Sequence, residues 1–342
     1  MYAYIDELCR RIKLFSAKAT DRTVDTVYFG GGTPTLLPTD CFEKLMSTLH
    51  NCFDIATEAE ITVECNPASI GKEGLKSLRE LGINRISIGL QSANDNELKA
   101  LGRLHNYNDF VSVYNDAREA GFDNISVDLM YGIPEQTAES FENTLRKVCA
   151  LSPEHISTYG LKIEEGTAFS SMREKLTLPD EDEEFNMYVL CDSILSENQY
   201  QRYEISNFSR HGKESRHNLK YWRLDDYIGF GVAAHSCFDG ERFGNSRNLT
   251  AFLNGEDITE ERATVSVEER ISEYIMLGLR LNCGISLQDY RNLTGRDLKE
   301  DFPMIDRYIK DGFMEEHDQS ISFTTKGFFV SNAILSDMLS FE

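Results

Sequence analysis

The sequence has no C-x-x-C pair and no Cys and His at zinc-binding spacing, although it holds eight cysteines in 342 residues. Structural zinc sites need such pairs, so we expect most of these cysteines to be reduced, buried side chains. Long apolar runs are also missing: no stretch reaches the roughly eighteen apolar residues of a membrane helix, and no basic-then-apolar leader opens the chain. These absences predict a cytoplasmic protein with no integral membrane segment.

Positive charge is scarce as well. The 35 Lys and Arg residues are outnumbered by 57 Asp and Glu residues, which leaves a net charge of −22. A chain this acidic repels phosphate backbones, so we do not expect a nucleic-acid partner. The length is sufficient for one large domain, or for a large domain with a smaller satellite.

Short apolar runs rich in Val, Ile and Tyr are present, and they alternate with helical patterns. This alternation indicates βα units and a parallel sheet, either open or closed into a barrel. The chain opens on a helical pattern with no strand before it, and Asp40 with Glu43 predicts the cap of the next helix. The predicted strands cover residues 24–29, 60–65, 85–90, 124–129 and 155–159, with another at 202–205.

The last quarter of the chain has a different pattern. A Glu-rich stretch at 256–261 is typical of a linker. Three helical patterns follow, and then a hairpin around residues 317–319 and a last helix, which together are typical of a winged-helix-like module. We therefore predict two domains, a barrel with its extension over residues 1–258 and a helical domain over residues 259–342. The acidic balance of the second domain favours packing against the first over binding DNA.

Three consecutive glycines, Gly30, Gly31 and Gly32, follow the first predicted strand and precede Thr33. They permit a ligand or another loop to approach the backbone closely. A phosphate-binding Walker loop would end in Gly-Lys-Ser/Thr, which is not the case here. The run therefore predicts a close contact without specifying a phosphate.

Polar or glycine residues also end the other predicted strands: Glu64, Gln91, Asp128 and Gly160. In parallel sheets ligands bind at the carboxyl ends of the strands. Turns and helix caps use the same residue types, so each of these positions alone is equally well explained by a turn. Several of them at one edge of the sheet favour a binding site.

These residues belong to motifs that carry a family resemblance. The segments GGGTP, ECNP, NRISIGLQS, LKALGR and VDLMYGIP, in this order, resemble the radical S-adenosylmethionine (SAM) family. Within it they are most similar to the oxygen-independent coproporphyrinogen III oxidases (HemN) and their HemW-like relatives, and the resemblance covers nearly the whole chain. It implies an α/β fold, namely a partial (βα) radical SAM barrel that lacks its first strand, with a C-terminal winged-helix-like module.

The resemblance implies a SAM site at the strand ends. The glycine run would lie against the methionine end of SAM, Arg103 would bind its carboxylate, and Glu64 would accept hydrogen bonds from its ammonium group. Without the resemblance, a surface ion pair would explain Arg103. The residues implied to bind SAM are Gly30, Gly31, Gly32, Thr33, Glu64, Gln91, Arg103, Asp128 and Gly160.

The family also uses a 4Fe–4S cluster, held by a C-x-x-x-C-x-x-C motif on the loop after the first barrel strand. This sequence has no such motif. We expect the strand, the loop and the three cysteines to lie upstream of Met1, lost by truncation or by a start codon assigned too late; a cluster-free relative is the alternative. The chain as given is then expected to be inactive as a radical enzyme, and we assign no catalytic residue. An incomplete barrel would also expose the edge of the strand at 24–29, which favours association.

Two functions compete within this resemblance. One is oxidative decarboxylation of coproporphyrinogen III to protoporphyrinogen IX by SAM radical chemistry. The other is a heme chaperone that binds heme and delivers it to acceptor proteins. The segment RHNLKYW at 216–222 matches the HNxxYW pattern of the HemW-like branch, which the oxidases lack. The chaperone is therefore our preferred interpretation, and a generic βα-barrel enzyme with another substrate is the remaining one.

The chemistry of this segment suits heme. A neutral imidazole is a common axial ligand of heme iron, which makes His217 the candidate ligand, and Tyr221 and Trp222 offer flat apolar faces to a porphyrin. Alternatively, His217 lies in a turn and the two aromatic residues belong to the core. His235 is a weaker second candidate, because its apolar neighbours in the sequence are more typical of a core histidine.

Overall fold

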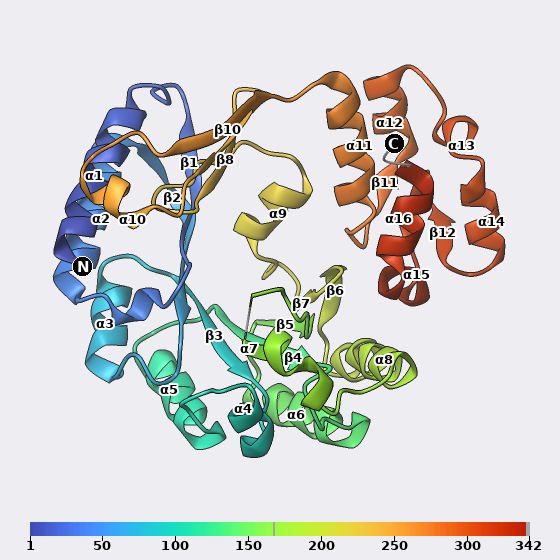
Figure 1. Ribbon diagram of the computed structural model, residues 1–342, viewed down its shortest axis with the longest axis horizontal. Helices are drawn as coiled ribbons and strands as arrows, with labels where there is room; N and C mark the ends of the chain where they lie inside the picture. Colours follow the sequence, from blue (N-terminus) through green and yellow to red (C-terminus); the bar gives the residue numbers. More distant parts are fainter. Residues whose placement is uncertain (167, 340–342) are drawn as a thin grey trace.

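The computed structural model describes residues 1–166 and 168–339, and Figure 1 shows its course. A seven-stranded sheet in the order β1-β2-β3-β4-β5-β7-β6 forms a curled half-barrel. Strands β1 to β5 pair in parallel, whereas β7 pairs with β5 and β6 in the antiparallel sense. The strands are β1 (Thr23–Phe29), β2 (Asp54–Cys65), β3 (Arg85–Gln91), β4 (Ile125–Tyr131), β5 (His155–Gly160), β6 (Gln201–Glu204) and β7 (Asn207–Ser209).

Helices cover the convex face of this sheet (Figure 1). Residues of β3 and β4 that point outward, such as Ile86, Ile88 and Val127, are fully buried in one apolar core against the helices. Because side chains alternate along a strand, the intervening residues face the concave side and are polar, as Arg85 and Ser126 show. The helices of this layer are α1 (Tyr2–Ser16), α2 (Thr39–Cys52), α3 (Lys72–Glu80), α4 (Asp95–Ala100), α5 (Tyr107–Glu119), α6 (Ala138–Leu151) and α8 (Glu181–Glu197).

The predicted parallel sheet is thereby confirmed, but some local predictions are wrong. Asp40 does not cap α2: the helix begins at Thr39 after Pro38, and no side chain caps it. Pro38 supplies the φ that a helix start needs, so the chain turns one residue earlier than the Asp-Glu pattern indicates. By contrast, α5 ends at Glu119, shortly before Gly121, whose φ of +93° suits glycine at that position.

A second, three-stranded sheet lies beside β1, and the short helix α9 lies on the concave side of the half-barrel (Figure 1). The sheet has the order β10-β9-β8. The Glu-rich stretch predicted as a linker forms the start of β10, which pairs with β9 in the antiparallel sense. These elements are β8 (His235–Phe238), β9 (Glu241–Asn245), β10 (Thr259–Thr264), α9 (Arg216–Trp222) and α10 (Leu249–Leu253); α7 (Ala168–Met172) follows β5, and short 3-10 turns cover Pro34–Leu36 and Arg173–Lys175.

The C-terminal helices pack around a core of their own, separate from the core of the half-barrel. A small sheet in the order β11-β13-β12 completes the unit. It joins the half-barrel through an isolated bridge between Glu204 and Leu281 and a hydrogen bond from Ile205 N to Arg280 O. Its elements are α11 (Val267–Gly278), β11 (Ile285–Ser286), α12 (Leu287–Thr294), α13 (Leu298–Asp301), α14 (Met304–Lys310), β12 (Met314–His317), β13 (Ser320–Phe323), α15 (Thr325–Phe329) and α16 (Ser331–Leu339).

The domain division at residue 258 stays a prediction. None of the helices in the described part of the chain combines the length and apolarity that crossing a membrane requires.

Candidate functional site

The carboxyl ends of β1 to β5 place the predicted SAM residues along one edge of the sheet. The register aligns Phe29 with Val63, Cys65 with Ile88 and Asp128 with Ser157. Because all five strands are parallel, their last residues and the loops that follow lie at the same edge. The glycine run, Glu64, Gln91, Asp128 and Gly160 therefore share that edge, and their SAM-binding roles stay predictions.

Glu64 connects the glycine run to β1. Its Oε2 accepts a hydrogen bond from the Gly31 N–H at 3.1 Å, and its Oε1 accepts one from the Tyr28 hydroxyl at 2.9 Å. Burial is the main reason that the pKa of Glu64 is raised. Gly31 has φ of +110°, and a Cβ on Gly30 would lie 2.7 Å from the Tyr28 ring. The conformation of the backbone and the contact with Tyr28 thus explain why glycine occupies these two positions. A Cβ on Gly32, by contrast, would meet open space.

Gln91 reaches its position through an irregularity in β3. Its φ is +71°, and the register between β3 and β4 shifts between Gly89 and Gln91. The bulge re-aims the Gln91 side chain, which is buried. Its Nε2 would lie 2.8 Å from a Cβ on Gly89, so a side chain at position 89 would displace the Gln91 amide.

Asp128 faces the concave side among serine hydroxyls. Ser87 Oγ lies 3.1 Å from both carboxylate oxygens and Ser126 Oγ lies 3.4 Å from one of them. Burial is the largest cause of the raised pKa of Asp128, and the hydroxyls and Arg85 oppose it. The carboxylate is thus held in a polar layer that can also accept from ligand hydroxyls.

Arg103 lies in the loop between α4 and α5, half-buried, and burial lowers its pKa. Within the described part of the chain no carboxylate lies within ion-pair distance of it, so the surface ion pair offered as the alternative explanation does not form. A partly desolvated guanidinium without an anion is suited to a ligand carboxylate. At the far strand, Gly160 ends β5, where a Cβ would lie 3.1 Å from the Tyr131 ring, and Thr33 precedes the 3-10 turn Pro34–Leu36.

His217 lies on α9, next to β1. Ser215 caps this helix by accepting from Asn218 N. Both carboxylate oxygens of Glu60, on β2, accept backbone hydrogen bonds at the start of α9, from Arg216 N at 3.1 Å and His217 N at 3.0 Å. The negative charge at the helix N-terminus and these two bonds fix the position of His217 relative to the sheet.

The imidazole of His217 is held on three sides. Nδ1 lies 3.0 Å from Thr26 Oγ1 and Nε2 lies 2.8 Å from the Tyr221 hydroxyl. The ring stacks on Tyr28, with centroids 4.8 Å apart and planes 19° apart. Burial, with a smaller contribution from Lys220, lowers the pKa of His217 to about 4. The imidazole is therefore neutral at physiological pH, the form that ligates iron.

The rest of α9 is open rather than part of the core. None of its residues is fully buried, and Tyr221 is 39% exposed. Tyr221 also packs edge-on against Tyr227, with ring centroids 4.7 Å apart. Trp222, the last residue of the helix, is partly buried. The alternative in which Tyr221 and Trp222 belong to the hydrophobic core is thus not what the structure shows.

Some residues of this region were missed or misjudged from the sequence. His235, interpreted as a core histidine, is exposed on β8. Thr26 and Tyr28 were not singled out, although their spacing of two in a strand places them on one face. Tyr203 lies beside α9, since its hydroxyl accepts from Ser215 N at 3.3 Å.

The cysteines do not fit an iron–sulfur cluster. All eight are free thiols, and seven of them are buried or partly buried. Among the described residues no group of three or more His, Cys, Asp or Glu is arranged to hold a metal ion.

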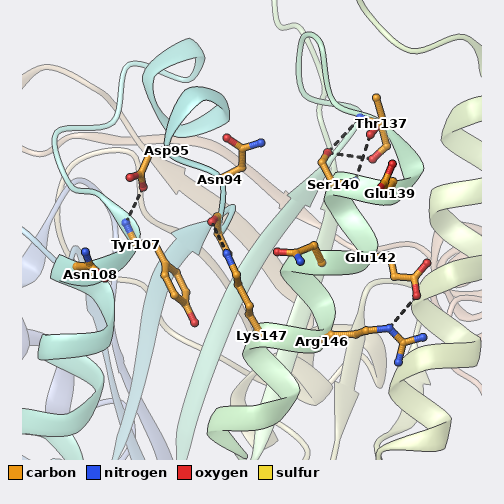
Figure 2. Close-up of a pocket in the computed structure, with 12 residues that line it drawn as sticks. Asn94, Asp95, Tyr107, Asn108, Thr137, Glu139, Ser140, Glu142, Arg146 and Lys147 are labelled. Carbon is orange, nitrogen blue, oxygen red and sulfur yellow. Dashed lines mark hydrogen bonds and ion pairs between the residues drawn. The ribbon is translucent and has the colours of Figure 1, made fainter.

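A cavity of about 840 Å³ lies elsewhere, in the outer layer between α4, α5 and α6 (Figure 2). Polar side chains line it, and Lys147 lies over the Tyr107 ring there. None of the predicted site residues lines this cavity.

A curled half-barrel sheet with helices on its convex face is the architecture of radical SAM proteins. A Radical SAM superfamily model matches residues 6–148, and a HemN C-terminal domain model matches residues 265–330. The family cofactors are SAM and a 4Fe–4S cluster; the residues described above fit the first and not the second.

Two relatives and one solved structure show to which part of this superfamily the chain is similar. The heme chaperone HemW of Bacillus subtilis (strain 168) is 33% identical over 98% of this chain and 91% of its own length. The heme chaperone HemW of Escherichia coli (strain K12) is 32% identical over 98% and 90%. The coproporphyrinogen III oxidase HemN from Escherichia coli has the same fold, with a TM-score of 0.85 at 24% identity over 99% of this chain and 83% of that one. The chain belongs to the HemN- and HemW-like family of radical SAM proteins.

Proposed function

We propose that this chain binds heme through His217, with Tyr221 and Trp222 beside the porphyrin, and delivers heme to acceptor proteins in the cytoplasm. SAM binds at the strand ends through the residues from Gly30 to Gly160 named above. The names of the curated HemW relatives support this assignment. It depends most on one observation, the arrangement of the His217 imidazole.

That arrangement suits an axial ligand. In the tautomer protonated on Nδ1, Nδ1–H donates to Thr26 and Nε2 accepts from the Tyr221 hydroxyl. Histidines that bind metals usually hold one ring nitrogen in this way, which orients the other. Tyr221 is exposed and can move aside without opening the core, so that Nε2 becomes available to iron.

The oxidase is the second candidate, because the solved HemN oxidase covers almost the whole chain with the same fold. Its radical chemistry requires a 4Fe–4S cluster, and the described residues offer no ligand set for one. Conversion of coproporphyrinogen III to protoporphyrinogen IX, followed anaerobically by porphyrin fluorescence, would bring this candidate forward.

The test is a hemin titration of the chain, followed by Soret absorbance. We expect a saturable Soret shift in the unsubstituted chain and its loss in His217→Ala. The matched control is His211→Ala, which removes an exposed histidine outside α9 and should bind hemin as the unsubstituted chain does. Circular dichroism verifies that all three proteins are folded.

Equal hemin affinity in His217→Ala and the unsubstituted chain would remove His217 as the ligand. In that case His235→Ala is the next variant, because His235 is also exposed near this side of the sheet. Absence of saturable binding by the folded, unsubstituted chain would contradict the chaperone proposal itself.

A further inference from the structure

Tyr28 lies between the predicted SAM site and the proposed heme ligand. Its hydroxyl donates to Glu64 Oε1 at 2.9 Å, while its ring stacks on the His217 imidazole at a centroid distance of 4.8 Å. Among the residues that the structure describes, no other side chain both hydrogen-bonds to Glu64 and contacts His217. The two sites are therefore neighbours that share one aromatic residue.

The position of Tyr28 is tightly defined on the side of the glycine run. A Cβ on Gly30 would lie 2.7 Å from Tyr28 Cε1, so the ring already touches the backbone there. On the other side Thr26, which shares its face of β1, holds Nδ1 of His217. A change at Glu64 is thus transmitted to the imidazole through a ring that packs against both.

Glu64 has one protein partner on each carboxylate oxygen, Tyr28 on Oε1 and Gly31 on Oε2. A ligand that donates hydrogen bonds to this carboxylate competes with the Tyr28 hydroxyl for Oε1. Loss of that bond frees Tyr28 and weakens the stack that orients His217.

We infer that Tyr28 is a positioning residue shared by the two sites, through which occupation of Glu64 lowers the affinity of His217 for heme. The inference rests on the proposed function, because it takes His217 as the heme ligand. Thermodynamic linkage makes the effect reciprocal. Bound heme must then lower, by the same factor, the affinity of any ligand that displaces Tyr28 from Glu64. The SAM site and the heme site would accordingly oppose each other.

The experiment is a double-mutant cycle on the full chain, with the hemin dissociation constant from Soret titration as the readout. The variants are Tyr28→Phe, which keeps the ring and removes the hydroxyl, Glu64→Ala, which removes the acceptor, and the double variant. Loss of a single hydrogen bond of this kind should weaken hemin binding about fivefold. We expect that factor in each single variant and no further loss in the double variant, because both changes break the same bond.

Two controls separate positioning from general destabilisation. Tyr114→Phe also deletes a buried tyrosine hydroxyl, which donates to Leu151 O at 2.8 Å and accepts from the Arg118 guanidinium, but on α5, away from both sites. It should lower the thermal midpoint as Tyr28→Phe does and leave hemin affinity unchanged. Glu64→Gln keeps an acceptor oxygen for Tyr28 and should restore most of the affinity lost in Glu64→Ala.

The outcomes are distinct. If the unsubstituted chain binds hemin, His217→Ala does not, and Tyr28→Phe and Glu64→Ala bind as tightly as the unsubstituted chain, the inference is wrong and the proposed function stands. Additive losses in the double variant would also overturn it, since they would show two independent effects. Absence of hemin binding by the unsubstituted chain overturns the proposed function and the inference together.

Discussion

At the scale of single residues, the His217 ring combines features that rarely meet in a core histidine. Both nitrogens have hydroxyl partners, the ring lies on an aromatic face, and its pKa of about 4 keeps it neutral. One partner, Thr26, belongs to a strand of the sheet, whereas the other, Tyr221, is exposed on the same short helix. The inner nitrogen is therefore fixed, and the outer nitrogen is covered by a group that can leave.

This asymmetry gives opposite predictions for the two hydroxyls. Tyr221→Phe removes the competitor for Nε2, and since a hydrogen bond contributes about 1 kcal/mol, hemin affinity should rise about fivefold. Thr26→Val removes the group that orients Nδ1 and should lower the affinity. Soret titrations of both variants check this, and equal changes in the same direction would contradict the roles assigned to Thr26 and Tyr221.

Site residues that belong to a sequence motif could be predicted. Site residues that are defined only by their neighbours in space could not. The order of the motifs was enough to bring Glu64, Gln91 and Asp128 to one edge of a parallel sheet. Tyr28 and Thr26 could not be identified in this way, because their partner His217 follows some 190 positions later. The exposure of His235 was misjudged because apolar neighbours in the sequence are not its neighbours in space.

At the scale of elements, the strands were the most predictable features. Their apolar runs are buried on the helix side, so composition alone marks them. The start of α2 was misplaced because Pro38 takes the role given to Asp40. The strand β10 was missed because its exposed Glu-rich sequence has no apolar face; pairing with β9 supplies its structure.

The junction between β6 and the C-terminal helices contains a titratable group. Glu204 is 1% exposed, its Oε2 has no hydrogen-bond partner, and burial raises its pKa to about 7. An unfolded Glu titrates near 4.3, so between these values the folded state binds more protons and stability falls as pH rises. Above about pH 7 the stability that the protonated Glu204 carboxyl contributes is fully lost.

Glu204→Gln should therefore change the pH dependence of unfolding. Relative to the unsubstituted chain, we expect the variant to gain on the order of 2 kcal/mol in unfolding free energy between pH 5 and pH 8. Urea unfolding followed by circular dichroism at pH 5, 6, 7 and 8 measures the difference. A gap between the two proteins that does not vary with pH would show that Glu204 has an ordinary pKa in the folded state.

At the scale of the whole molecule, the net charge and the edge of the sheet have opposite effects on the association of chains. Among the described residues β1 pairs with β2 alone, and most of its residues are partly exposed. A strand edge of this kind favours association, which the net charge of −22 opposes by repulsion. The balance depends on the salt concentration, because the Debye length shortens from about 10 Å at 0.1 M to about 3 Å at 1 M ionic strength.

We therefore expect the average mass in solution to increase with ionic strength. Light scattering coupled to size-exclusion chromatography, at 0.05 M and 1 M sodium chloride, measures it directly. A mass that is the same at both salt concentrations would show that the β1 edge does not mediate association.

The hydrogen bond between Thr26 and His217 joins residues 191 positions apart. Contacts of such separation form only after the intervening chain has been made and folded. During synthesis, β1 to β5 and their strand-end loops leave the ribosome well before α9 does. A nascent chain thus acquires the sheet edge first and the oriented imidazole later, so the two predicted sites are completed at different stages of synthesis.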